Sequence, residues 1–145
     1  SGTQVIAIEY GHRYKLLADV PEIELRLDLL ELNGTDLVIT DFKTSRSRWN
    51  DDNVREHLGQ LVLYANGLVP LMKDIGATRI VPRFVIVSKA KKPAVQILVP
   101  KATQEDVMRL KSTIADTWTA IKSGVFVQRE SFWCAQCPFK KRCLG

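Results

Sequence analysis

The sequence has no long hydrophobic run and no secretory leader. No segment approaches the roughly 18 uninterrupted apolar residues that a membrane helix needs, and no basic and then apolar stretch precedes a cleavage site. We therefore expect a soluble, unsecreted protein without a membrane anchor. Ser1 and Gly2 are typical of the remnant of a cleaved expression tag, so we expect the natural protein to extend further at its N-terminus.

Cysteine is absent until close to the C-terminus. Cys134, Cys137 and Cys143 all fall within the stretch FWCAQCPFKKRC. A disulfide framework spreads an even number of cysteines along a chain, so this odd cluster argues against one and favours ligation of a metal or of a cluster. We treat residues 130–145 as a cysteine-rich tail.

Internal repeats and low-complexity linkers are also absent. A chain of 145 residues that is 46% hydrophobic suits one globular domain with its own core, over residues 1–145. The net charge of +5 suits a polyanionic partner. Charge alone is a weak signal, because basic runs such as SKAKKP are more often solvated surface than binding sites.

The apolar patterning predicts strands, a helix, further strands and a second helix. The dipeptide Asn33-Gly34 is typical of a tight hairpin turn, because both residue types tolerate positive φ. Asn50 or Asp51 can cap a helix that ends near Gly67, and Thr103 begins the last helix, with Gly124 beyond its end. The predicted strands cover residues 3–9, 13–19, 23–32, 36–43, 79–90 and 94–100.

The hairpin brings two acids together. If Asn33 and Gly34 form the loop, Asp28 and Asp41 become diagonal neighbours on one face, at roughly 7 to 8 Å between Cα atoms. Lys43 projects from the same face, one pleat further on. Both carboxylates can then reach one cation.

Two interpretations of this pair remain open. The acids can be surface residues, one neutralised by Arg26 and the other by Lys43. However, the second strand of the hairpin is apolar on both faces, which is typical of a covered, central strand. Two carboxylates that converge beside such a strand need a positive partner, because burial and mutual repulsion both disfavour their charge. A divalent cation supplies that charge directly.

The predicted helix carries a polar stripe. Gln60 and Tyr64 are four residues apart and share one helical face, with His57 one turn earlier. Gln60 can be an exposed helix former and Tyr64 a half-buried anchor. Alternatively, the amide and the phenol hydrogen-bond to Lys43 or to substrate phosphates. We expect His57 to be structural or peripheral.

The order of these motifs resembles the RecB-type nucleases of the PD-(D/E)XK superfamily, including CRISPR-associated and helicase-fused members that carry an iron–sulfur cluster. The resemblance runs from about Ile23 to Cys143: an aspartate on one strand, ITDFKTS on the next, a helix with Q-x-x-x-Y and a final C-x2-C-P-F-K-x2-C. It implies an α/β (α+β) fold with a restriction-endonuclease-like core, a mixed central β-sheet flanked by helices. Gln60 and Tyr64 match the family's Q-x-x-x-Y element and would belong to the catalytic set.

The resemblance also implies a role for the hairpin residues. Asp28 and Asp41 would bind Mg²⁺ or Mn²⁺ with the backbone carbonyl of Phe42. Lys43 would orient or help to deprotonate the attacking water and stabilise the charge that develops on the phosphate. Glu9 falls where relatives often carry an upstream glutamate, which makes it a weaker candidate for a metal ligand.

Two features depart from the family pattern. Leu25 stands where relatives usually have a glycine, three residues before the first aspartate. Relatives with a cluster also have a fourth cysteine far upstream, and this chain has none, although iron–sulfur clusters and structural zinc normally take four ligands. The fourth ligand of a 4Fe–4S cluster or of Zn²⁺ could lie outside this chain, His12 or His57 could replace it, or aromatic packing could hold the tail instead.

The segment SRSRW, residues 45–49, has two interpretations. Arg46 and Arg48 could contact phosphates while Trp49 stacks on a base. Alternatively, the segment is a polar loop with one anchoring aromatic residue.

By resemblance, we expect a Mg²⁺- or Mn²⁺-dependent deoxyribonuclease that acts on single strands or free ends. It would be exonuclease-like, cytoplasmic and of prokaryotic or phage origin. It would serve recombination, repair or mobile-element and phage DNA processing, with a possible helicase or recombination partner. The alternative is a nucleic-acid-binding or scaffold domain that has the same fold and a cysteine-ligated metal but cuts nothing. A small zinc-binding interaction module would explain only the tail.

Overall fold

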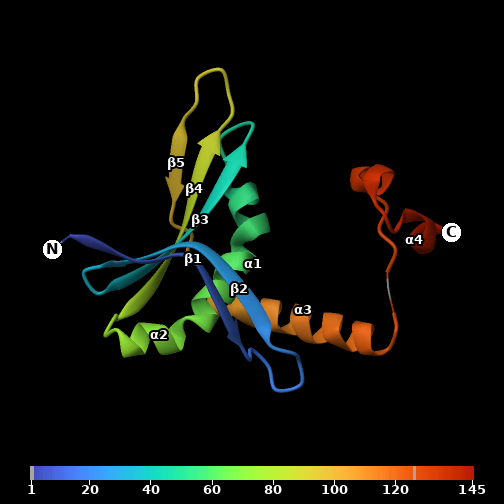
Figure 1. The fold of residues 1–145 in the computed structure, drawn as a ribbon, viewed down its shortest axis with the longest axis horizontal. Helices are drawn as coiled ribbons and strands as arrows, with labels where there is room; N and C mark the ends of the chain where they lie inside the picture. The colour runs from blue at the N-terminus through green and yellow to red at the C-terminus, as the bar shows by residue number, and fades with distance from the viewer. Residues whose placement is uncertain (1, 126) are drawn as a thin grey trace.

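The protein is a mixed five-stranded sheet flanked by helices, followed by a short C-terminal segment (Figure 1). The computed structural model describes residues 2–125 and 127–145. In chain order the elements are β1 (Thr3–Tyr14), β2 (Ile23–Asn33), β3 (Asp36–Ser45), α1 (Asp51–Gly67), α2 (Val69–Asp74), β4 (Arg79–Ser88), β5 (Val95–Leu98), α3 (Gln104–Lys122), the 3-10 helix η1 (Phe132–Gln136) and α4 (Lys140–Leu144).

The strands follow the order β1-β2-β3-β4-β5 across the sheet. Every neighbouring pair is antiparallel except β3 and β4, which run parallel. Parallel neighbours need a crossover connection, and α1 and α2 provide it. The predicted α+β fold, a mixed central sheet with flanking helices, is confirmed.

The prediction of two short strands at the N-terminus was wrong. Residues 3–9 and the first part of 13–19 belong to one strand, β1, and residues 16–20 form bends and a turn. Gly11 lies inside this strand opposite Arg26 and does not adopt positive φ. The long β2 pairs with β1 from end to end, so tertiary pairing overrides the local turn signal of Tyr10-Gly11.

The β2–β3 hairpin was predicted correctly, but its register differs by two residues. Asn33 pairs with Asp36, so the loop is Gly34-Thr35 rather than Asn33-Gly34. Gly34 has φ 62°. A glycine with positive φ at the first loop position is typical of a type II′ turn, which leaves Asn33 in the strand. A shift of two residues keeps every side chain on its predicted face.

The core lies between the sheet and α1. The buried side chains of β3 and β4 on this face include Leu37, Ile39, Phe84 and Ile86, and they pack with Leu61 of α1. On the opposite face Val38 is buried, but several other apolar residues of the sheet are exposed. These exposed residues are Phe42, Val87, Val95 and Ile97.

The two long helices begin as predicted. The side chain of Asn50 accepts a hydrogen bond from the backbone of Asn53, and Asn53 returns the bond to the backbone of Asn50. Thr103 and Asp106 form the same reciprocal cap on α3. These caps satisfy N–H groups that the first turn leaves without partners. The sequence did not predict α2, a single short helix that contains Pro70.

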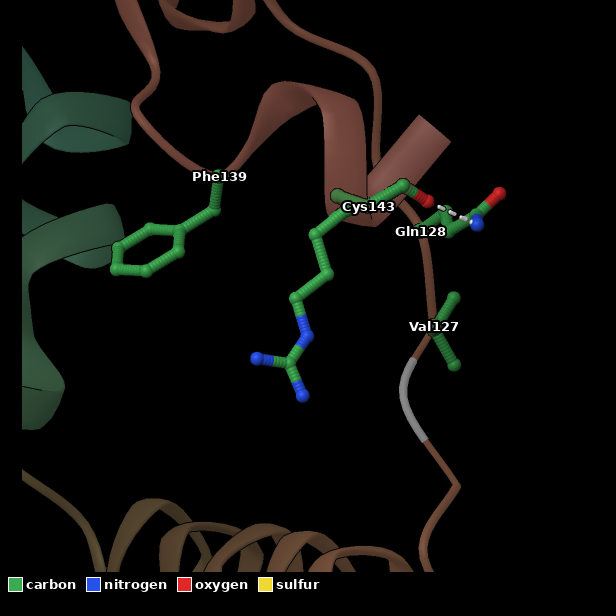
Figure 2. A pocket seen from close by; sticks show the side chains of 5 residues that line it. Val127, Gln128, Phe139 and Cys143 are labelled. Carbon is green, nitrogen blue, oxygen red and sulfur yellow. Dashed lines mark hydrogen bonds between the residues drawn. The ribbon is translucent and has the colours of Figure 1, made fainter. Parts of the chain in front are cut away.

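The C-terminal segment stands apart from the sheet in Figure 1. Phe132 and Trp133 contact each other edge to face, yet they are 81% and 73% exposed. The idea that aromatic packing holds the tail on the domain therefore receives no support. Gln128 donates a hydrogen bond to the backbone carbonyl of Cys143, beside an open pocket of about 410 Å³ that belongs to this segment (Figure 2).

Candidate active site

Asp41 and Lys43 lie where β3 leaves β2 and continues along β4. The last β2–β3 pair is Leu29 with Thr40, one residue before Asp41. Asp41 is only 3% exposed. The apolar run of β3 therefore delivers a carboxylate into the buried layer beneath α1, with the lysine two residues further on the same face.

Asp28 lies across the hairpin from this acid. It is the next residue of β2 beyond the last pair with β3. Its Oδ2 accepts a hydrogen bond of 2.7 Å from the backbone N–H of Phe42, the residue after Asp41. The paired residues end at Leu29 and Thr40, one position before the two aspartates, and this bond fixes the Asp28 carboxylate beside the strand that carries Asp41.

A chain of polar contacts links β3 to α1 and then to β2. Nζ of Lys43 lies 2.8 Å from Oδ2 of Asp41 and donates a hydrogen bond of 3.0 Å to Oε1 of Gln60. Nε2 of Gln60 donates to the hydroxyl of Tyr64 at 2.7 Å, and this hydroxyl donates to the carbonyl of Arg26 at 2.8 Å. Of the two interpretations of the helical stripe, the geometry favours the one in which Gln60 contacts Lys43.

The environment of Asp41 disfavours its charge. Burial is the main reason why the pKa of Asp41 is raised above its ordinary value, and the negative charge of Asp28 adds to the effect. Lys43 and, more weakly, His57 act in the opposite direction without cancelling the rise in pKa. Oδ2 of Asp41 is buried, and the ammonium of Lys43, 2.8 Å away, is its charged partner among the described residues.

The two aspartates fit a hard divalent cation. A buried carboxylate whose pKa is raised by burial and by a second carboxylate is a favourable place for added positive charge. Mg²⁺ is usually held by one or two carboxylates together with waters and substrate phosphates. Over residues 2–125 and 127–145, no group of three or more His, Cys, Asp and Glu side chains is arranged to hold a metal ion. The protein thus offers a pair of acids rather than a closed cage.

Glu9 and Asp28 both fall between the paired residues Ile8–Leu29 and Tyr10–Leu27 of the β1–β2 ladder and are not themselves paired. The φ of Glu9 is 49°, the left-handed region that side chains other than glycine rarely adopt. The side chain is exposed, and it forms no three-acid group with Asp28 and Asp41. Glu9 therefore lies on the strand next to Asp28 but does not form a metal-binding group of three acids with Asp28 and Asp41.

Trp49 is an anchor for the loop between β3 and α1. Its ring lies 4.6 Å from the ring of His57 and 5.2 Å from that of Phe84, measured between centroids. Its backbone N–H donates to Oε1 of Gln96 at 2.9 Å, and Nε2 of Gln96 donates to the backbone carbonyl of Trp49 at 3.0 Å. This geometry agrees with the alternative of an anchoring aromatic residue.

Sequence reasoning missed Gln96. In sequence it is the polar member of an alternating strand, between Val95 and Ile97, and nothing in that pattern distinguishes it from any solvent-facing residue. Arg46 and Arg48, on the loop that Gln96 holds, are both exposed.

The two histidines are engaged elsewhere. Nδ1 of His57 lies 2.9 Å from the carbonyl oxygen of Asn53, and a carbonyl can only accept, so Nδ1 carries the proton. His12 stacks between Tyr10 and Tyr14 on β1. The histidines and the tail cysteines form no metal-binding group of three or more within the described parts of the chain. The proposed replacement of the fourth ligand by His12 or His57 is thus not supported.

The three tail cysteines form no disulfide bond. Cys134 and Cys137 are partly buried and Cys143 is exposed. The sulfur of Cys134 accepts a hydrogen bond of 3.3 Å from the backbone of Ser131 at the start of η1.

Comparison with known proteins agrees with this geometry. Two solved structures share the fold: a protein from Eubacterium rectale described as a "Putative exonuclease" (13% identity, TM-score 0.58) and SSO0001 (17% identity, TM-score 0.51). Each alignment covers 94% of this chain, which spans only 51% and 59% of those two chains. No curated protein matches the sequence. A profile of the PD-(D/E)XK nuclease superfamily matches residues 2–144, and the chain therefore belongs to this superfamily.

Proposed function

We propose that the chain is a metal-dependent nuclease that hydrolyses DNA phosphodiester bonds, with Asp28, Asp41, Lys43, Gln60 and Tyr64 as its active site. One observation carries this proposal. The buried carboxylate of Asp41 lies 2.8 Å from the ammonium of Lys43, which is itself held by Gln60 of the neighbouring helix. An ion pair with only a structural role needs no hydrogen bond from a helix to its lysine. A site that must bind a cation and a phosphate needs the lysine held in place, as Gln60 holds it here.

Mg²⁺ or Mn²⁺ would be held by Asp28 and Asp41, with the backbone carbonyl of Phe42 as a further oxygen ligand. When bound, such an ion supplies an activated water and neutralises charge on the phosphate. Glu9 is a weaker candidate for an additional ligand, because it lies between the residues of β1 that pair with Leu29 and Leu27, the neighbours of Asp28.

Lys43 would orient or help to deprotonate the attacking water and stabilise the charge on the phosphate. The donors and acceptors along the chain of hydrogen bonds determine which atom of Gln60 faces Lys43. The single proton of the Tyr64 hydroxyl goes to the carbonyl of Arg26, so the oxygen of Tyr64 must accept from the Gln60 amide nitrogen. The amide oxygen of Gln60 then accepts the hydrogen bond from Lys43. This bond would hold the ammonium near the site even when a metal ion replaces the ammonium beside Asp41.

We further propose action on single strands or free ends, in recombination, repair or the processing of phage and mobile-element DNA. The support is the RecB-type order of the motifs and the likeness in fold to a protein described as a "Putative exonuclease". A helicase or recombination partner is part of the same proposal, because the motif order resembles that of helicase-fused RecB-type nucleases.

For the tail, we propose that residues 130–145 belong to one domain with residues 1–129 and that Cys134, Cys137 and Cys143 ligate a 4Fe–4S cluster or Zn²⁺. The fourth ligand would come from outside this chain. A visible absorption spectrum of the anaerobically purified full-length protein, together with metal analysis, separates cluster from zinc. A protein with neither would contradict the proposal.

The nuclease proposal is tested with linear single-stranded, linear double-stranded and circular single-stranded DNA, in Mg²⁺, Mn²⁺ or EDTA. We expect cleavage of the linear single strand only with the metal, and little cleavage of the circle if free ends are needed. Asp41→Asn and Lys43→Met should each reduce cleavage by roughly 100-fold or more while the circular dichroism spectrum stays unchanged.

Cleavage at the wild-type rate by both folded variants would refute the site. DNA binding without cleavage in any metal would instead support the alternative of a non-cutting nucleic-acid-binding or scaffold domain.

A further inference from the structure

We propose that the β3–α1 loop and the β4–β5 turn together form a basic platform that binds the sugar-phosphate backbone of the substrate next to the active site. The inference rests on the proposed nuclease function and adds to it a surface for the strand that extends beyond the scissile bond. The platform consists of Arg46, Arg48, Lys89, Lys91 and Lys92.

Hydrogen bonds hold the two segments side by side. Ser45, the last residue of β3, pairs with Ser88, the last residue of β4, and the backbone N–H of Lys89 donates to the carbonyl of Ser45 at 2.7 Å. The β3–α1 loop and the β4–β5 turn lie together at the top of the sheet in Figure 1. Residues more than 40 positions apart in the sequence therefore share one end of the molecule.

Both segments are anchored. Gln96 of β5 pairs through its amide with both backbone groups of Trp49, so the loop that carries the two arginines is fastened to the strand that leaves the turn. At the base of the turn, Ser88 and Ala94 exchange two hydrogen bonds, of 2.9 and 3.0 Å. An anchored surface loses less conformational entropy when a ligand binds than a flexible one does.

The charge on these segments is of one sign. Residues 42–50 and 84–102 contain no aspartate or glutamate. All five platform side chains belong to exposed residues, and none takes part in an ion pair with the described acids. Several other arginines of the fold are paired with acids: Arg13, Arg79, Arg83 and Arg109. Exposed cations without acidic partners are free to replace the counterions of a phosphate backbone.

The platform continues the line of the active-site strand. β3 runs from Asp41 through Lys43 to Ser45 and enters the loop at Arg46. Five residues of extended chain cover about 16 Å, so a strand bound at Asp41 would meet the platform within a few nucleotides. Cationic side chains contact phosphates without reading bases, so we expect the platform to bind without sequence preference.

The test compares two triple variants. Lys89→Gln, Lys91→Gln and Lys92→Gln together remove three charges from the platform. The matched control carries Lys15→Gln, Lys73→Gln and Lys122→Gln, three exposed residues after β1, on α2 and at the end of α3. These elements lie away from the turn in Figure 1. Each triple lowers the net charge from +5 by three, to +2.

Binding of a fluorescein-labelled single-stranded oligonucleotide is measured by anisotropy in EDTA, over a series of salt concentrations. The platform triple should weaken binding by about tenfold and reduce the slope of log K against log salt by about 2, because each lost phosphate contact removes roughly 0.7 for a single strand. The control triple should stay within about twofold of wild type. In the cleavage assay, the platform triple should raise KM and leave kcat unchanged.

A third variant separates the placement of the charges from their number. Gln96→Leu keeps all five cations but removes both hydrogen bonds to Trp49. It should weaken oligonucleotide binding less than the platform triple but more than the control triple.

Equal losses in the two triples would overturn the platform, because the effect would then be one of net charge alone. So would binding by the platform triple at wild-type strength. Since the binding assay needs no metal and no cleavage, a protein that cuts DNA but fails this comparison disproves only the platform. A protein that passes it but never cuts disproves only the nuclease.

Discussion

The ammonium of Lys43 on β3 donates a hydrogen bond of 3.0 Å to the amide oxygen of Gln60 on α1. It is the only side-chain hydrogen bond found between these two elements in the described parts of the chain. Nζ of Lys43 also lies 2.8 Å from Oδ2 of the buried Asp41. The helix thus sets the position of the lysine relative to the acid. A lysine without this contact would be free to point into solvent on its long, flexible side chain.

Gln60→Leu should therefore lower kcat for DNA cleavage by roughly 10- to 100-fold, because a misplaced catalytic group costs about this much. KM should change little. The control is Asn66→Leu, which removes an amide from the same helix whose hydrogen bond goes to Val62 rather than to the site. Equal activity of the two variants would contradict the positioning role of Gln60.

Asp41→Asn should make the protein without metal more stable at neutral pH. Burial raises the pKa of Asp41 above its ordinary value, so the ionised carboxylate is less favourable in the folded protein than in the unfolded chain. An amide of the same shape carries no charge to desolvate. Urea unfolding in EDTA should show a higher midpoint for the variant, and a lower midpoint would mean that the ion pair with Lys43 outweighs burial.

The same shift in pKa fixes the pH dependence of this difference. The pKa of Asp41 is higher in the folded protein than its ordinary value of 3.8. The protonated carboxyl group therefore contributes its full stability below pH 3.8, and this contribution is lost as the pH rises through the pKa of the folded protein. The gap in urea midpoint between Asp41→Asn and wild type should thus be largest near about pH 7 and shrink towards about pH 4. A gap that does not depend on pH would show that the titration of Asp41 is not its cause.

Mn²⁺ or Mg²⁺ should raise the melting temperature of the wild-type protein. A cation that binds only the folded state stabilises it by mass action, by about 2.7 kcal/mol at a hundredfold excess over Kd. Asp28→Asn and Asp41→Asn should each remove most of this gain. Glu24→Gln, which removes an exposed acid of the same strand as Asp28, should retain it. Equal gains in all four proteins would mean that the metal binds elsewhere.

The sequence predicted what local chemistry determines. The glycine of the hairpin, the caps Asn50 and Thr103 and the spacing of Gln60 and Tyr64 are short-range signals, and the structure places these residues as they indicate. The candidate site follows from them, because a register error of two residues leaves Asp41 on the same face.

Long-range contacts could not be predicted in this way. The continuity of β1 depends on its partner strand β2 rather than on its own sequence. The contact between Gln96 and Trp49 joins residues 47 positions apart, and any polar residue in an alternating strand looks the same. The cysteine tail shows the opposite limit: a clear motif predicts ligation, but the structure brings no group of three metal ligands together among its described residues.

Gly67→Ala should destabilise the protein, although alanine is the better helix former. A Cβ atom at this position would lie 2.6 Å from Cδ1 of Leu25 and 2.7 Å from the ring of Tyr14, both too close for carbon atoms. Leu25 is 1% exposed and cannot move into solvent. Overpacking of this kind costs typically 1 to 3 kcal/mol, so urea unfolding should show a lower free energy of unfolding for the variant.

Gly59→Ala on the same helix is the matched control. Its Cβ would meet only Cδ1 of Leu110, at 3.6 Å, an ordinary van der Waals contact with α3. Since alanine is favoured over glycine in a helix interior by about 1 kcal/mol, this variant should be as stable as wild type or more so. If both substitutions stabilised the protein alike, the close approach of α1 to β1 and β2 at Gly67 would be wrong, and with it the placement of the helix that holds Gln60 over Lys43.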